Sequence, residues 1–349
     1  MIQEATTNAR AKLDKTTARQ RYQPYENLDI DLIAAPWGFG GTDNLAQEGP
    51  HALLAEQDLV KQLTAIGAKA VEIHPPSLGP FEIQEEANRV RNLEAIHTVN
   101  NWLADKVKSS LKAGHVPITL GGDGSLCLGT VAGLLEYCME SNAADEVAGA
   151  RFGIIWISNH LCNSSPRVTK SWNANRMVFT ALTFDGDPQH DDFISLMTFR
   201  GLGTKTKSMM RPNQIVHLGI NHKSAQEEAV HEFYTMEDIE EIGVRKAINH
   251  AIDHFKNFDK VHVILDVNAF DLSAVSNYSL GQLNYREAMT IARELDLNLR
   301  RQGKLSSIDI VEHCPSREAW DKKGETAEWV KDFITNIFGE NIFNAARKY

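Results

Sequence analysis

Short apolar runs alternate with longer amphipathic stretches from residue 28 onward, and this alternation most constrains the fold. The apolar runs are typical of buried strands, and the stretches between them have helical spacing. The predicted strands span residues 28–35, 69–73, 115–120, 152–157, 178–182, 214–218, 261–266 and 306–312. The predicted helices span residues 49–63, 85–112, 126–139, 236–254, 285–301 and 325–338. This order predicts an α/β fold with a mainly parallel sheet covered on both faces.

The 349 residues contain no internal repeat or long linker, so one domain is expected over residues 28–349. Residues 1–27 are predicted to form a helical N-terminal arm. This arm mixes basic and acidic residues and has no apolar core, which disfavours both a transit peptide and a signal peptide. We therefore expect a cytoplasmic protein.

Charge and hydropathy disfavour two classes of partner. The formal net charge of −10 provides no excess of basic residues for phosphates, so nucleic acid is not expected as a partner. No apolar run approaches the roughly 20 residues that cross a bilayer, so no membrane insertion is expected. The four cysteines are scattered without metal-site spacing, which is typical of buried thiols in a reducing compartment.

Four of the predicted strands end in polar clusters, and these clusters indicate the functional site. They are Gly121–Ser125, Ser158–Ser165, Asp266–Asp271 and Glu312–Ser316. Ligands of parallel α/β sheets bind outside the carboxyl ends of the strands, so we expect the clusters to converge there. Ser158, His160 and Cys162 alternate, which in extended geometry points all three to one side.

The residue types at these strand ends allow several interpretations. His160, Cys162 and Asp266 could hold one softer ion such as zinc, or His160 could be hydrogen-bonded to Asp266 or to a backbone carbonyl. Cys162 could be a reactive thiol with His160 as its base, or a small buried residue. Glu312 could recognise a guanidinium or an amine, or pair with a neighbouring cation of the protein. The glycines before Asp123 could cradle an anion, although close packing is the simpler explanation.

Five blocks in the same order resemble the arginase and agmatinase (ureohydrolase) family, and the likeness covers nearly the whole chain after the arm. The first, Gly121-Gly122-Asp123-Gly124-Ser125, is similar to the family's Gly-Gly-Asp-His-Ser. The segment Trp156–Cys162 resembles Trp-Val-Asp-Ala-His-Ala-Asp, and Ser171–Met177 resembles Ser-Gly-Asn-Leu-His-Gly-Met. Asp266–Leu272 resembles Asp-Val-Asp-Gly-Leu-Asp-Pro, and Val311–Ser316 resembles Met-Glu-Val-Asn-Pro-Ser.

The resemblance implies a site that has lost most of its metal ligands. Members of the family bind two Mn²⁺ through two histidines and four aspartates, and a metal-bridging hydroxide attacks the guanidinium carbon of the substrate. Of these ligand positions only His160 and Asp266 match here. The substituted positions are Gly124, Ser158, Cys162 and Asn268.

The same comparison covers the residues around the metals. Asn175 stands where the family has its catalytic histidine, and an amide cannot shuttle a proton near pH 7. Ser164 stands where the arginase pattern has asparagine, and the substrate-binding block is also altered, reading Gly219–Ser224. Asp123 is retained, and so is Glu312, whose family role is to hold the guanidinium group.

These observations predict a three-layer α/β/α arginase-like protein without a binuclear manganese cluster. We expect no cofactor, no guanidinium hydrolysis, and a binding, regulatory or assembly role. The alternative is a repurposed enzyme, metal-independent or with a single ion, that acts on a small guanidino, amidino or amide substrate. By resemblance the protein is expected to form a homo-oligomer, a trimer or hexamer, and a small cation is the expected class of ligand.

Overall fold

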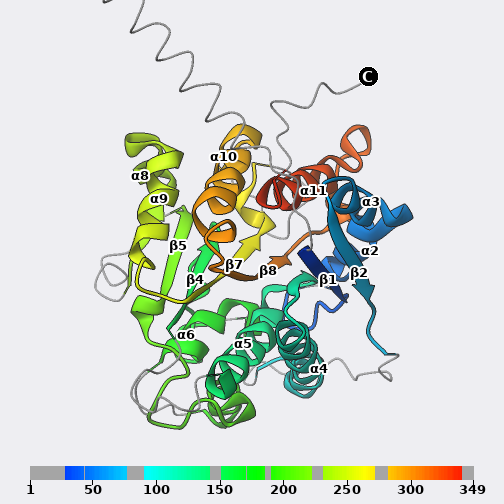
Figure 1. The fold of residues 1–349 in the computed structure, drawn as a ribbon. Helices are drawn as coiled ribbons and strands as arrows, with labels where there is room; N and C mark the ends of the chain where they lie inside the picture. Colours follow the sequence, from blue (N-terminus) through cyan, green and yellow to red (C-terminus); the bar gives the residue numbers. More distant parts are fainter. Residues whose placement is uncertain are drawn as a thin grey trace, which may run out of the picture.

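An eight-stranded sheet forms the centre of the molecule in the computed structural model (Figure 1). The structure describes residues 28–42, 44–76, 90–141, 151–169, 171–184, 190–221, 231–271 and 282–339. The predicted N-terminal arm, residues 1–27, lies outside the described residues. No helix in the described ranges is long and apolar enough to cross a membrane.

The strands lie in the order β2-β1-β3-β8-β7-β4-β5-β6, and every neighbouring pair is parallel. Their bounds are β1 Leu28–Ala35, β2 Ala68–Ile73, β3 Val116–Gly121, β4 Phe152–Ile157, β5 Ile215–Ile220, β6 Phe233–Thr235, β7 Lys260–Asp266 and β8 Leu305–Val311. The predicted parallel α/β fold is therefore confirmed. Because β8 and β7 lie between β3 and β4, strand ends far apart in the sequence become neighbours.

Helices cover both faces of the sheet, which completes a three-layer α/β/α arrangement (Figure 1). On one face lie α4 Leu93–Lys112, α5 Cys127–Ser141, α6 Val178–Thr183 and α7 Asp191–Met197. On the other lie α2 Gly49–Leu54, α3 Asp58–Ala65, α8 Met236–Ile242, α9 Val244–His254, α10 Tyr285–Leu295 and α11 Glu325–Ile337. Each face has its own hydrophobic core, so the strands are apolar on both sides.

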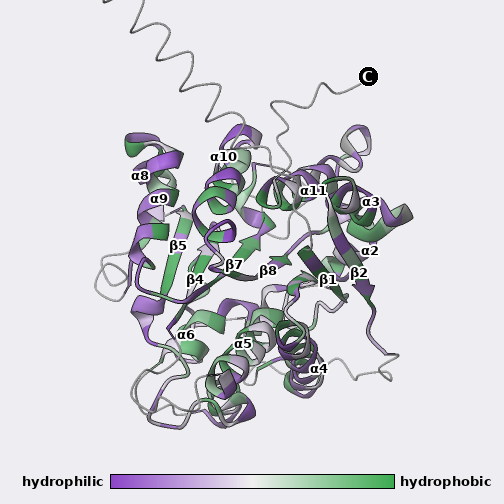
Figure 2. Ribbon diagram, viewed as in Figure 1, coloured by the Kyte–Doolittle hydropathy of each residue, from purple (hydrophilic) through white to green (hydrophobic). Residues whose placement is uncertain are grey.

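The distribution of hydropathy follows this layering. All six residues of β4 are buried, whereas the edge strand β2 is only partly buried. Figure 2 shows the same contrast, with hydrophobic central strands and hydrophilic residues interspersed along β2. Continuous apolar runs therefore mark the central strands, because helices shield both of their faces from water.

Several predicted element boundaries were wrong for local reasons. Residues 178–182, predicted as a strand, form helix α6, because a short apolar run of this kind fits a buried helix as well as a strand. The predicted helix over 49–63 is interrupted at Gln57, and the long helix predicted from residue 85 begins at Leu93, after Asn92. Both Gln57 and Asn92 have left-handed backbone conformations, which an α-helix cannot contain.

The helix predicted over 236–254 is two helices, divided at Gly243, whose φ of 84° ends α8. The last helical turn predicted near Arg301 is a π-helical segment, Asp296–Arg300, that follows α10. Strand β6 and helix α7 were not predicted. Both are short, and β6 has only three residues, too few for a periodic pattern.

Candidate functional site

The four polar strand ends converge as predicted, because β3, β8, β7 and β4 are consecutive strands of the sheet. Their parallel pairing places all four carboxyl ends at one edge. Asp123, Ser158, Asp266 and Glu312, one from each strand end, are all buried, with at most 5% of any residue exposed. The candidate site is therefore a buried polar cluster at this edge.

Glu312 connects the ends of β8 and β3. Its Oε1 accepts a 2.7 Å hydrogen bond from the backbone N–H of Gly124 and a 3.0 Å hydrogen bond from Nδ2 of Asn175. Both donors are uncharged groups. Glu312 has a φ of 69°, a left-handed conformation that is uncommon outside glycine, so the backbone turns sharply where this carboxylate enters the site.

Asp266 connects the ends of β7 and β4. Its Oδ2 accepts a 2.8 Å hydrogen bond from Oγ of Ser158, and its Oδ1 accepts a 2.9 Å hydrogen bond from the backbone N–H of Asn268. Oγ of Ser158 also accepts a 3.1 Å hydrogen bond from the backbone N–H of His160. Both oxygens of Asp266 are therefore held by groups of the protein itself.

Asp123 holds the backbone of two turns. Its Oδ1 accepts a hydrogen bond from the N–H of Ser125 at 2.7 Å, and its Oδ2 accepts one from the N–H of Gly40 at 2.8 Å. Gly40 approaches so closely that a Cβ atom would lie 2.5 Å from Oγ of Ser125. Asp123 thus links the glycine-rich turn after β1 to the end of β3. The close approach of the two turns accounts for glycine at position 40.

Burial and the charge of Glu312 raise the pKa values of two carboxyl groups of the site. Burial raises the pKa of Asp123 to about 7, and the negative charge of Glu312 adds to the effect. The pKa of Asp266 is also raised to about 7, again first by burial and then by the charge of Glu312. Asp123 and Asp266 are therefore only partly ionised near neutral pH.

The pKa values of Cys162 and His160 favour the neutral thiol and the neutral imidazole. Burial raises the pKa of the Cys162 thiol well above its usual value, and the charges of Asp266 and Glu312 raise it further. The pKa of His160 is lowered, first by burial and then by the charge of Arg176. A nucleophilic cysteine needs the opposite shift, so this environment disfavours the thiol–base interpretation.

Arg176 is the residue of this region that the sequence analysis missed. It lies in the turn before α6, and its backbone C=O accepts a 2.8 Å hydrogen bond from the N–H of Ser164. Its positive charge lowers the pKa values of both His160 and Cys162. The signal was in the quoted block Ser171–Met177, where Arg176 stands at a family glycine.

These donors do not fit a pair of manganese ions. Mn²⁺ prefers carboxylate oxygens, but the substituted positions present a hydroxyl, an amide, a thiol of raised pKa and no side chain at all at Gly124. Across the described residues, no three His, Cys, Asp or Glu side chains are grouped to hold a metal ion. The mononuclear site considered for His160, Cys162 and Asp266 therefore gains no support.

Comparisons with known proteins agree with the sheet and the strand ends. The model of the arginase family matches residues 28–339. The chain belongs to the arginase family. An arginase of Staphylococcus aureus (strain COL) is 28% identical over 325 residues, which cover 90% of this chain and 98% of that protein. The mitochondrial arginase-2 of Homo sapiens is 25% identical over 323 residues, covering 89% and 85% of the two chains.

The fold of this arginase-family protein also matches solved arginase structures. The comparison with the crystal structure of arginase from Bacillus subtilis gives a TM-score of 0.71 and 25% sequence identity. The match covers 90% of this chain and 99% of the Bacillus subtilis chain. The framework of the family is therefore kept over nearly its whole length. Of the altered substrate-binding block, Gly219–Ile220 ends β5, whereas residues 222–224 lie outside the described residues.

Proposed function

We propose that this arginase-family protein binds a small organic cation at the strand-end site and does not hydrolyse guanidinium groups on a manganese pair. The observation that carries the proposal is the buried cluster of Asp123, Asp266 and Glu312, whose carboxyl groups face uncharged partners. A guanidinium or ammonium group would neutralise this excess of negative charge. The role that follows is binding or regulation rather than catalysis.

Loss of hydrolysis follows from charge and proton transfer. Two Mn²⁺ ions bring four positive charges, and Asp266 is the one carboxylate left at the matched ligand positions. Its oxygens are held by Ser158 and Asn268. Without the metals no water is activated as a nucleophile, and the amide of Asn175 provides no proton shuttle near pH 7.

Binding of a cation is coupled to ionisation of the buried carboxyl groups, whose raised pKa values lie near 7. A cation that enters the cluster interacts with the ionised carboxylates, so it draws their pKa values back toward the usual range. We therefore expect affinity to increase as the pH rises through about 7, where Asp123 and Asp266 ionise. Glu312 is the best placed recognition group, because both of its described hydrogen bonds go to Oε1.

The test compares methylguanidinium with N-methylurea, which has nearly the same shape and no charge. We expect methylguanidinium to raise the melting temperature in a saturable way and N-methylurea to leave it unchanged, since a ligand adds RT ln(1 + [L]/Kd) of stability. Glu312→Gln should lose the effect, and Asp253→Asn, at an exposed carboxylate of α9, should keep it. Equal responses to the two ligands would overturn the proposed binding.

A separate measurement tests the absence of hydrolysis. The protein is incubated with Mn²⁺ and then assayed for urea release from L-arginine and agmatine, and its metal content is determined. We expect neither stoichiometric manganese nor urea. Stoichiometric manganese together with urea release would contradict the proposed absence of hydrolysis. It would not affect the conclusion drawn from the binding experiment.

We also propose that the chain assembles into a homo-oligomer, a trimer or hexamer, as the family resemblance implies. Assembly does not depend on the metal ligands, so it can persist when catalysis is lost. Sedimentation velocity of the full chain measures this directly. A single monomeric species across a wide range of protein concentration would contradict it.

A further inference from the structure

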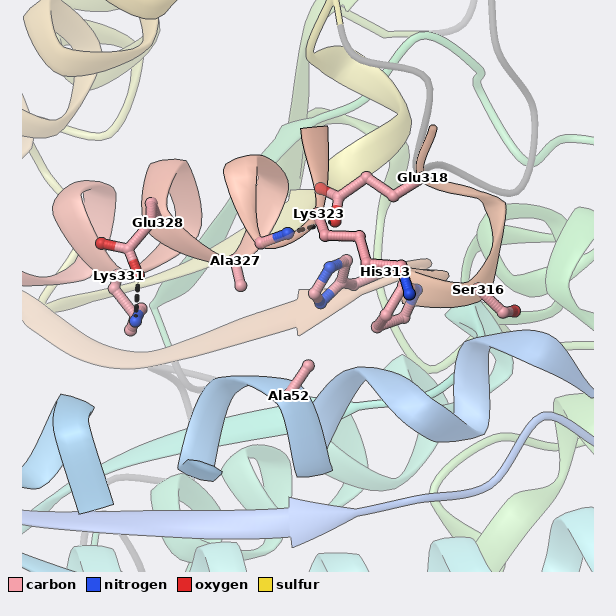
Figure 3. Close-up of a pocket in the computed structure, with 10 residues that line it drawn as sticks. Ala52, His313, Ser316, Glu318, Lys323, Ala327, Glu328 and Lys331 are labelled. Carbon is pink, nitrogen blue, oxygen red and sulfur yellow. Dashed lines mark hydrogen bonds and ion pairs between the residues drawn. The ribbon is translucent and has the colours of Figure 1, made fainter. Parts of the chain in front are cut away.

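A cavity lies between α2, the segment after β8 and the start of α11 (Figure 3). Its volume is about 600 Å³, within the range of about 300–1,000 Å³ that is typical of small-molecule sites. Its polar lining residues are His313, Ser316, Glu318, Lys323, Glu328 and Lys331. His313, Pro315 and Ser316 belong to the polar segment after β8, but Asp123, Ser158, Asp266 and Glu312, the buried polar cluster of the candidate site, do not line this cavity.

His313 is the feature that distinguishes this cavity from a surface groove. Its side chain is directed into the cavity, and the residue is 0% exposed to solvent (Figure 3). Within the described part of the chain, neither ring nitrogen has a hydrogen-bond partner of normal geometry. Leaving a buried polar group unpaired destabilises the folded state. The backbone of Gly49 approaches the ring without normal hydrogen-bond geometry, so a ligand group that bonds to a ring nitrogen would stabilise the buried His313 side chain.

The N-terminus of α11 forms another wall of the cavity and already attracts a carboxylate. Glu318 accepts a 2.7 Å hydrogen bond at Oε1 from the N–H of Thr326 and a further one at Oε2 from the N–H of Gly324. The partial positive charge of a helix N-terminus favours such an anion. Because Glu318 fills this position, an added ligand must find its countercharge elsewhere.

The two lysines of the cavity differ in their ion pairs. Lys331 is paired with Asp58 at 2.6 Å and with Glu328. Lys323 is exposed and forms no ion pair with any residue that the structure describes. Figure 3 shows its side chain in the same cavity as His313. One uncompensated positive charge is therefore available to a ligand.

We propose that this cavity binds a small monocarboxylate that also carries a hydroxyl or amide group. The carboxylate pairs with Lys323, the hydroxyl or amide hydrogen-bonds to the His313 ring, and Ala52 and Ala327 contact the carbon chain. The site selects a single negative charge, since Glu318 and Glu328 would repel a second one. A neutral imidazole can both donate and accept, which matches a hydroxyl.

The charge of His313 agrees with this assignment. Burial lowers its pKa to about 4, although the nearby charge of Glu318 opposes the shift. The ring is thus neutral at pH 7 and adds no second positive charge for a phosphate or a dicarboxylate. The other charged groups that line the cavity are Lys323, which precedes α11, and Glu328 and Lys331 on α11.

The experiment uses isothermal titration of the full chain at pH 7 and constant ionic strength with four matched compounds. They are 4-hydroxybutyrate, butyrate without the hydroxyl, 1,4-butanediol without the carboxylate, and succinate with two carboxylates. We expect 4-hydroxybutyrate to bind one per chain, butyrate to bind at least about tenfold more weakly because one hydrogen bond is lost, and the other two not to bind.

Lys323→Ala provides the decisive variant, because its side chain is exposed and the substitution leaves the core intact. It should weaken 4-hydroxybutyrate binding at least about tenfold, whereas Lys205→Ala, another exposed lysine, should not change it. His313→Gln, which keeps a donor and an acceptor, should retain binding better than His313→Phe. Absence of 4-hydroxybutyrate binding, equal binding by Lys323→Ala, or tighter binding of succinate would overturn the proposal.

Discussion

Oγ of Ser158 donates a 2.8 Å hydrogen bond to Oδ2 of Asp266, at the adjoining ends of β4 and β7. By the family resemblance both residues occupy metal-ligand positions, one substituted and one kept. The hydroxyl of Ser158 thus supplies a hydrogen-bond donor to a buried carboxyl group but brings no positive charge. The substituted serine and the retained aspartate form one hydrogen-bonded pair whose negative charge is not neutralised by Ser158.

Restoring the ligand set is expected to restore metal binding. The variant combines Gly124→His, Ser158→Asp, Cys162→Asp and Asn268→Asp. A Cβ at Gly124 would lie 3.5 Å from Oε1 of Glu312, an ordinary contact, so a side chain can be added there. We expect stoichiometric Mn²⁺ in the variant and none in the parent chain, measured as metal content after dialysis. If the folded variant binds no Mn²⁺, the strand ends are not arranged as a ligand set.

The thiol of Cys162 is expected to be unreactive near neutral pH. Its pKa is raised by burial and by the charges of Asp266 and Glu312, so little thiolate is present. Iodoacetamide should alkylate it at least about tenfold more slowly than a free cysteine at pH 7.5, since each pKa unit changes the thiolate fraction tenfold. Peptide mass spectrometry gives the rate, and the urea-unfolded chain is the control. Rapid labelling of the native protein would favour a nucleophilic role.

Replacement of Asp266 should change how stability depends on pH. Because its folded pKa is raised from 3.8 to about 7, the protonated form is favoured in the native state. Its contribution to stability is present below about pH 4 and is lost as the pH rises through about 7. An asparagine does not titrate, so Asp266→Asn does not lose this stability as the pH rises. The free energy of unfolding of the variant minus that of the parent should therefore increase by at least about 1 kcal/mol between pH 5 and pH 8.

Comparison with the parent at each pH removes the opposing contributions of His97, His160, His217 and His313, whose pKa values are lowered by burial. Chemical denaturation at several pH values provides the measurement. Asp271→Asn, at an exposed carboxylate, is the control and should show no such trend. A difference that is constant with pH would contradict the raised pKa of Asp266.

Two glycines of the same turn should differ sharply in their tolerance of alanine. A Cβ at Gly122 would lie 1.9 Å from the backbone oxygen of Trp37, which cannot move away without shifting the turn after β1. Gly122→Ala should therefore lower the free energy of unfolding by about 3 kcal/mol or more. Gly124→Ala, with ordinary contacts only, should change it by less than about 1 kcal/mol. Urea denaturation compares the two, and equal losses would be inconsistent with the close approach.

Prediction from the sequence succeeded where the signal was local and long enough. The run Phe152–Ile157 predicted a central strand because all its residues are apolar, and they are all buried. It failed for residues 178–182, where a short apolar run has no periodicity that separates strand from helix. The left-handed residues Gln57 and Asn92 interrupt predicted helices without a glycine or proline to reveal them.

The sequence by itself determined the parallel α/β class and the polar strand ends, because each depends on residues that are near one another in the chain. Through the family motifs it also predicted which metal-ligand positions are substituted, and this stays a prediction. Only the tertiary structure decided that Ser158 bonds to Asp266, that Gly124 and Asn175 both bond to Glu312, and that His313 lines a cavity. These contacts join strands that are distant in sequence and neighbours only in the sheet order β3-β8-β7-β4. The burial that results raises the pKa values of Asp123 and Asp266, and no local pattern in the chain encodes it.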